Sequence, residues 1–137
     1  MNDRRLNVFF YGLFMDKEIL TAKGIQPSDI QVASLKGFAL RIGQRAALVP
    51  EESGRVHGVV MSLTHDELEK LYSEPGVRVY RPEPVLVELN AGEIIAALCF
   101  NLVEPPPKDE HNAEYAAKLR DVAKRIGLPA DYITSIR

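Results

Sequence analysis

Apolar and polar residues alternate along much of the first hundred positions, which is the pattern of half-buried strands. Aromatic and β-branched residues are frequent in these segments. The pattern predicts strands within residues 6–12, 29–43, 46–63, 84–89 and 93–102. In the third segment, the turn-forming sequence PEESG (50–54) predicts two strands joined by a turn. NAGE (90–93) predicts a hairpin between the last two segments.

Two short helices are expected between these strands. Asp16 can cap the first helix, and Gly24 can end it. Thr64 and Glu67 have the spacing of a capping box at the start of the second helix. Pro75 disfavours the helical conformation at the preceding residue, so this helix should end at Glu74.

The clearest helical pattern lies near the end of the chain, after a stiff connector at Pro105–Pro107. Asn112 begins this helix, Gly127 suits a left-handed helix end, and Pro129 stops its continuation before one or two more helical turns. Strands therefore come first and helices later. This order predicts an α+β fold with a curved, mainly antiparallel sheet that can close as a barrel, in a single domain covering residues 1–137.

Composition and charge argue against a nucleic-acid-binding or membrane-spanning protein. The net charge is −2 and no basic stripe is present, so a nucleic-acid partner is not expected. No apolar run approaches membrane-spanning length. The single cysteine, Cys99, lies in the apolar run IIAALCF, which suits a buried residue in a reducing, cytoplasmic setting. A homodimer is compatible with this composition.

Motifs for several enzyme classes are missing. The histidines His57, His65 and His111 are scattered without metal-ligand spacing, and we expect no metal site. There is no nucleophile-elbow serine, phosphate-binding glycine loop or dinucleotide fingerprint, so no cofactor is expected. A mechanism based on a carboxylate, or no catalysis, remains.

Two places can carry chemistry. In FFYGLFMD, a strand turns at glycine into a helix, which leaves backbone N–H groups able to hold a carboxylate or a developing oxyanion. In LYSEPGVRVYRP, Glu74 stands at a helix-to-strand corner before Pro75 and Gly76. We expect Glu74 at the barrel mouth, partly removed from water and suited to proton transfer. The alternative is a solvated glutamate at a helix end.

Several segments together resemble the γ-glutamylcyclotransferase-like family, with its plant avirulence-induced members. The aromatic strand ends at Tyr11-Gly12, and Glu74 is followed shortly by Tyr80. The segments SLKGFAL, RVHGVVMSLTHDELEKLY and EPVLVEL also carry the resemblance, as does the tail HNAEYAAKLRDVAKRIGLPADYITSI. The likeness extends over nearly the whole chain.

The resemblance implies a small mixed β-barrel flanked by helices, and release of 5-oxoproline from a small γ-glutamyl amide without metal or cofactor. Glu74 would then be the catalytic residue, taking a proton from the substrate ammonium and passing it to the leaving amine. The residues that match the family's substrate-binding positions are Tyr11, Gly12, Leu13, Phe14, Tyr80 and Tyr115.

This sequence departs from the family pattern at two points. Leu13 and Phe14 replace the small hydroxyl residue that usually follows Tyr-Gly, and Pro75 replaces a glycine after the glutamate. Two further hypotheses therefore stay open. One is a non-catalytic module on the same fold that binds a small carboxylate, and the other is an interaction domain with a vestigial pocket.

Overall fold

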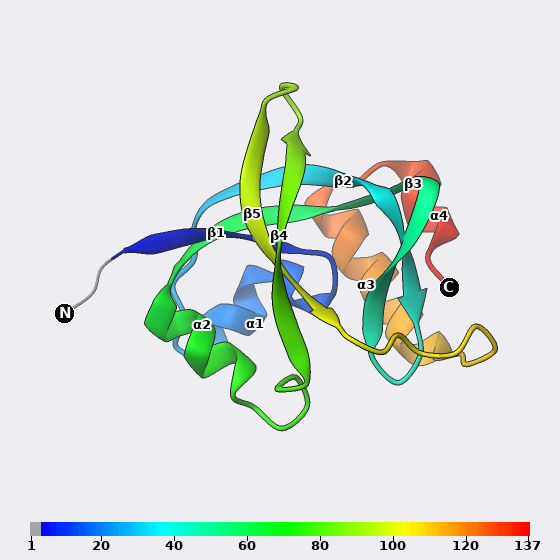
Figure 1. Ribbon diagram of the computed structural model, residues 1–137, viewed down its shortest axis with the longest axis horizontal. Coiled ribbons are helices and arrows are strands. Elements are labelled where there is room, and N and C mark those ends of the chain that lie inside the picture. Colours follow the sequence, from blue (N-terminus) through cyan, green and yellow to red (C-terminus); the bar gives the residue numbers. More distant parts are fainter. Residues whose placement is uncertain (1–3) are drawn as a thin grey trace.

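Five strands close into a barrel in the computed structural model, which describes residues 4–137 (Figure 1). The strands are β1 (Arg5–Phe10), β2 (Ser28–Ile42), β3 (Ala46–Thr64), β4 (Tyr80–Leu89) and β5 (Ile94–Leu102). Their order around the barrel is β1-β3-β2-β4-β5. All neighbouring strands are antiparallel except β1 and β5, whose parallel pairing closes the barrel. The predicted α+β barrel is confirmed.

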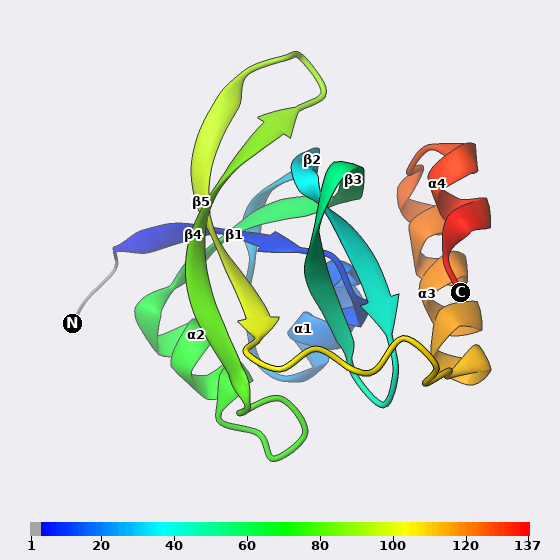
Figure 2. The ribbon, with the colours of Figure 1, turned by 45° about the vertical axis from the view of Figure 1, so that its right-hand side comes forward.

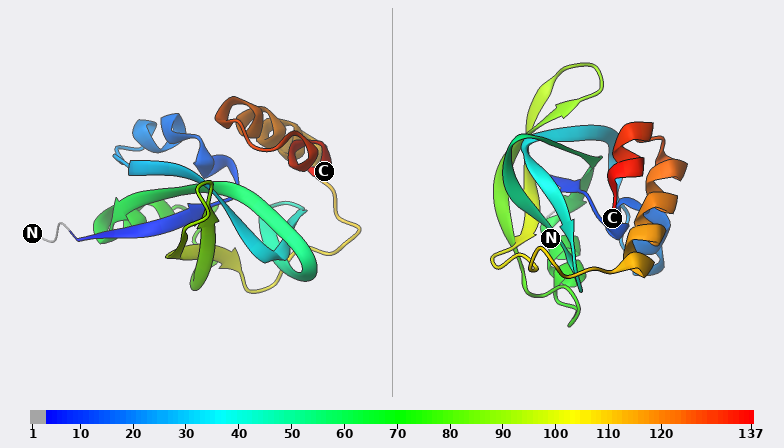
Figure 3. Two further views of the ribbon diagram at one scale, coloured as in Figure 1. Left: turned by 90° about the horizontal axis from the view of Figure 1, so that it is seen from above. Right: turned by 90° about the vertical axis from the view of Figure 1, so that its right-hand side faces the viewer.

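Helices surround the barrel at its ends and on one flank. They are the short 3₁₀ helix η1 (Leu13–Met15) and the α-helices α1 (Lys17–Ala22), α2 (His65–Tyr72), α3 (Ala113–Ile126) and α4 (Ala130–Ser135). Figures 2 and 3 show α3 and α4 together on one flank, while the β4–β5 hairpin projects beyond the barrel. No helix within residues 4–137 is long and apolar enough to cross a membrane.

The barrel interior and the inner face of α3 form one apolar core. Its largest buried side chains have less than 2% of their surface exposed. They include Phe9, Leu20, Ile25, Met61, Leu63, Leu71, Leu119 and Ile136. Residues from β1, β3, α1, α2 and α3 thus share one core, so the helices that border the site are fixed to the barrel by apolar burial.

The helix ends follow the sequence closely. Asp16 accepts a hydrogen bond from the Glu18 N–H at 3.1 Å, and both bonds of the Thr64–Glu67 capping box form. Other predicted ends are also present: Gly24 and Gly127 have positive φ, and Asn112 caps α3. The predicted hairpin between β4 and β5 is confirmed as well.

Two boundaries differ from the prediction. Residues 50–54 do not form a turn between two strands, because β3 runs unbroken from Ala46 to Thr64. The extra residues are absorbed as an irregularity in the β2–β3 pairing, where Lys36 pairs with Arg55 but Phe38 pairs with Pro50. Helix α2 ends at Tyr72, two residues before Glu74, and the Ser73 hydroxyl donates to the Lys70 carbonyl at 2.8 Å.

A substitution at Gly58 tests the close contact between β1 and β3. A Cβ atom at this position would overlap the backbone carbonyl oxygen of Phe10, which cannot move without shifting β1. We expect Gly58→Ala to lower the free energy of unfolding by about 1–3 kcal/mol. At Gly76 an added Cβ would meet nothing within 4 Å, so Gly76→Ala is the matched control. Urea unfolding with an unchanged m-value measures both, and equal stabilities would contradict this account.

Candidate functional site

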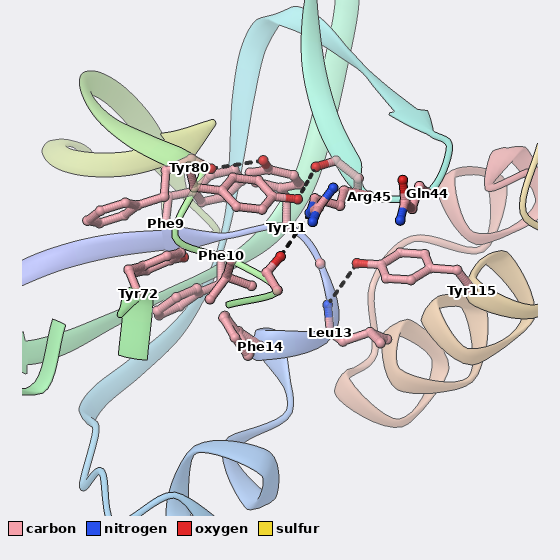
Figure 4. Close-up of a pocket in the computed structure, with 15 residues that line it drawn as sticks. Phe9, Phe10, Tyr11, Leu13, Phe14, Gln44, Arg45, Tyr72, Tyr80 and Tyr115 are labelled. Carbon is pink, nitrogen blue, oxygen red and sulfur yellow. Dashed lines mark hydrogen bonds between the residues drawn. The ribbon is translucent and has the colours of Figure 1, made fainter. Parts of the chain in front are cut away.

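A cavity of about 250 Å³ opens where β1 ends and turns into η1 (Figure 4). Its walls come from most parts of the chain: the β1 end and η1, the β2–β3 turn, the end of α2, the following loop, β4, β5 and α3. The lining residues are Phe9, Phe10, Tyr11, Gly12, Leu13, Phe14, Gln44, Arg45, Ala46, Tyr72, Gly76, Val77, Tyr80, Phe100 and Tyr115. All six predicted substrate-binding residues lie in this one wall, and their contact with a substrate stays a prediction.

The turn after β1 forms one side of the cavity. Its backbone is held by hydrogen bonds from the Met15 N–H to the Gly12 carbonyl at 3.0 Å and from the Asp16 N–H to the Leu13 carbonyl at 3.1 Å. The Tyr115 hydroxyl accepts a long hydrogen bond from the Leu13 N–H at 3.4 Å. A Cβ at Gly12 would lie 2.7 Å from that hydroxyl. A side chain at position 12 would therefore displace the Tyr115 hydroxyl from the turn.

The tyrosine hydroxyls divide into two kinds. Tyr11 donates to the Phe100 carbonyl at 2.9 Å, and Tyr80 donates to the Ala46 carbonyl at 2.5 Å. Both hydroxyl protons are thus used in hydrogen bonds to backbone carbonyls of the barrel. The Tyr115 oxygen instead accepts from the turn, so its own O–H remains able to donate to a ligand.

Aromatic rings make the rest of the cavity apolar. Tyr72 stacks on Phe100 with ring centroids 3.9 Å apart and planes 9° apart. Phe14 meets Tyr72 edge-on at 5.9 Å and Phe10 edge-on at 6.3 Å. Phe14 thus belongs to an aromatic cluster. The sequence analysis did not single out Tyr72, and its place at the last position of α2 is the signal that was missed.

Glu74 is not among the residues that line the cavity, and its carboxylate is turned to Lys23. The Lys23 ammonium binds both oxygens of its carboxylate, at 2.7 and 3.0 Å, and 44% of the side chain is exposed. The backbone carbonyl of Glu74 accepts hydrogen bonds from Val77 and Arg78, which form the turn that the sequence leads one to expect. Gly76 and Val77 reach the cavity in its place. A catalytic role for Glu74 stays a prediction.

No lining residue carries a carboxylate, and the one formal charge in the wall belongs to Arg45. Sequence reasoning missed Arg45 and its neighbour Gln44, which lie in the short β2–β3 turn. Their only signal is a pair of polar residues between two apolar strands.

Cys99 and the three histidines do not line this cavity. Within residues 4–137, no group of three or more His, Cys, Asp and Glu side chains is arranged to hold a metal ion. Burial raises the pKa of the Cys99 thiol to about 12, with Glu83 adding to the shift, so this residue is a protonated core side chain near neutrality.

The fold and site together define a small mixed barrel with an aromatic pocket at a strand–glycine–helix turn. The chain belongs to the gamma-glutamyl cyclotransferase, AIG2-like family, whose model matches residues 8–119. It is 34% identical over 115 residues to AIG2-like protein A of Arabidopsis thaliana, which covers 79% of this chain and 70% of that protein. The resemblance seen in the sequence is confirmed.

Solved structures share the fold. A structure described as gamma-glutamyl cyclotransferase superposes with a TM-score of 0.77 at 22% identity, covering 98% of this chain and 89% of that chain. An uncharacterized protein from Homo sapiens superposes with a TM-score of 0.78 at 21% identity, with the same coverage of both chains. At these identities the likeness concerns the fold alone.

The tyrosines give a test of the buried pocket. Burial raises the pKa of every tyrosine in the chain above its ordinary value near 10. The unfolded chain therefore loses tyrosine protons at lower pH than the folded chain. Stability from this source is complete below about pH 9 and falls as the pH rises through 10 toward the folded pKa values.

We expect urea midpoints to fall between pH 9 and 11, while tyrosinate absorbance stays absent from the folded protein over the same range. Tyrosinate appearing near pH 10 in the folded state would contradict the buried arrangement.

Proposed function

We propose that this protein binds a small γ-glutamyl compound in the aromatic pocket, with the ligand's α-carboxylate at the turn of residues 11–14. The observation that carries the proposal is the meeting of this turn with Tyr115 in a chain of the gamma-glutamyl cyclotransferase family. The Tyr115 O–H is a donor suited to a carboxylate, and so are N–H groups of the turn other than those of Leu13, Met15 and Asp16, which already have acceptors.

The pocket also suits the rest of such a ligand. The stacked rings of Tyr72 and Phe100 give an apolar surface for the methylene groups of a glutamyl chain. A volume of about 250 Å³ fits a small molecule rather than a peptide segment. No carboxylate in the wall opposes an anionic ligand.

Cyclisation with release of 5-oxoproline is the second candidate, and family membership favours it. In this reaction the ligand's amine nitrogen bonds to its own γ-carbonyl carbon, and the bond from that carbon to the leaving amine breaks. Glu74 would accept the proton from the ammonium and return it to the leaving amine. To do so, its carboxylate must leave Lys23 and enter the cavity, from a position two residues before the lining residue Gly76.

The Tyr115 hydroxyl provides a test of binding. Tyr115→Phe removes one donor to the ligand, so we expect γ-glutamylglycine to bind roughly threefold to tenfold more weakly. Isothermal titration measures the change, and ligand-induced thermal stabilisation checks it. Tyr132→Phe is the matched control, because Tyr132 lies outside the pocket wall. Unchanged affinity in Tyr115→Phe would remove the Tyr115 hydroxyl from the binding site.

A product assay separates binding from catalysis. The protein is incubated with γ-glutamyl dipeptides, γ-glutamylamines and glutathione, and 5-oxoproline is measured by mass spectrometry. For cyclisation through Glu74, we expect product in the wild type, loss of at least about a hundredfold in Glu74→Gln, and little change in Glu83→Gln, whose residue lies outside the wall. If the ligand stabilises the protein but no product forms, the protein binds the ligand without catalysing its cyclisation.

A further inference from the structure

We propose that Arg45 is the specificity-determining residue of the pocket and selects γ-glutamyl compounds that carry a second carboxylate on the leaving-group side. This inference rests on the proposed binding function and names the class of ligand. γ-Glutamyl amino acids have such a carboxylate, whereas γ-glutamylamines lack it.

The charge of the wall is the first argument. Arg45 is the one charged residue among the lining residues, and the others are aromatic, aliphatic, glycine or amide side chains. Arg45 is half-buried, and the apolar walls beside it focus its field on an anion in the cavity. A ligand with a neutral leaving group would leave this charge without a partner.

The hydrogen bonding of Arg45 is the second argument. Its Nε atom donates to the Gly76 carbonyl at 2.9 Å, which ties the β2–β3 turn to the loop after α2. Among residues 4–137, neither terminal nitrogen has a hydrogen-bond acceptor, and no carboxylate forms an ion pair with the guanidinium. Figure 4 shows the side chain reaching toward the tyrosines of the pocket. The terminal nitrogens are thus the part of the side chain that is left to receive a carboxylate.

The turn that carries Arg45 is fixed from outside the pocket. The Glu110 carboxylate accepts a hydrogen bond from the Gln44 N–H, and the Asn112 side chain donates to the Gly43 carbonyl at 3.2 Å. A Cβ at Gly43 would overlap Glu110, which shows how closely the connector packs on this turn. Arg45 is therefore held in place before a ligand arrives, which lowers the entropic cost of binding.

The charge of Arg45 acts on the Tyr80 hydroxyl inside the pocket. Burial and Tyr115 raise the pKa of Tyr80, while Arg45 acts in the opposite direction by favouring the phenolate. The same attraction would act on a ligand carboxylate beside Tyr80.

A matched pair of ligands tests the role of Arg45. γ-Glutamylglycine and γ-glutamylglycinamide share one skeleton and one glutamyl carboxylate, and they differ in the second carboxylate. We expect the wild type to bind γ-glutamylglycine at least about tenfold more tightly in isothermal titration. In Arg45→Gln the two compounds should bind within about twofold of each other. Arg45→Lys should keep part of the preference, because it retains the charge but not the guanidinium geometry.

Arg78→Gln is the matched control, since Arg78 lies in the same loop region outside the wall and should leave the preference unchanged. Equal affinities in the wild type, or a preference that survives in Arg45→Gln, would overturn the role of Arg45 alone. A loss of both affinities to the same degree in Arg45→Gln would also overturn it, because Arg45 would then bind the shared glutamyl carboxylate. Failure of the wild type to bind either compound would reject the proposed function, and this inference with it.

Discussion

The parallel seam between β1 and β5 is the constraint on which the pocket depends. Only two residue pairs join these strands, Val8 with Leu98 and Phe9 with Cys99. Beyond this short pairing, β1 ends at Phe10 and the chain turns away into η1, while β5 continues to Leu102. The Tyr11 hydroxyl bridges the two diverging segments through the Phe100 carbonyl. The cavity opens where the backbone pairing between β1 and β5 stops, and side chains form its walls.

Asn101, next to Phe100 in β5, links β5 to β3. Its side-chain amide donates to the Leu48 carbonyl at 3.0 Å, and its oxygen accepts from the N–H groups of Leu48 and Leu102, both at 2.9 Å. β3 and β5 are not neighbours in the strand order, so this one buried side chain links strands that the backbone does not pair. A buried amide with its hydrogen bonds satisfied favours one arrangement of the barrel. Phe100 comes directly before Asn101, so it is held firmly. Its carbonyl accepts the hydrogen bond from Tyr11, and its ring stacks on Tyr72.

The parts of this design that the sequence predicts are local. Helix caps at Asp16 and Thr64 depend on residues within three positions, and the turn at Gly12 depends on one glycine between a strand and a helix. The prediction of a turn at 50–54 was wrong because the β2–β3 pairing continues past these residues through a shift in register, which the local sequence does not reveal.

The parts that escaped prediction depend on distant residues. The local sequence around Glu74 gives no sign of its partner, Lys23, which lies 51 positions earlier and binds its carboxylate. Arg45 has no local feature that marks it as a pocket residue. Its position follows from Gly76 on one side and from a turn held by Glu110 on the other. Family resemblance supplied the turn and the tyrosines, but it could not reveal which residue carries the charge.

A cation in the wall changes what catalysis in this pocket would require. Cyclisation needs the neutral amine of the ligand, and at neutral pH an α-amino group is largely protonated. A nearby guanidinium disfavours the ammonium form, and so does an apolar wall, so both would lower the pKa of the bound amine. Arg45 and the aromatic rings would thus do part of the work that a carboxylate base does elsewhere. Glu74 would then be needed to take the proton that the attacking nitrogen loses on ring closure and pass it to the leaving amine. Lys23 opposes this step as long as it binds the carboxylate.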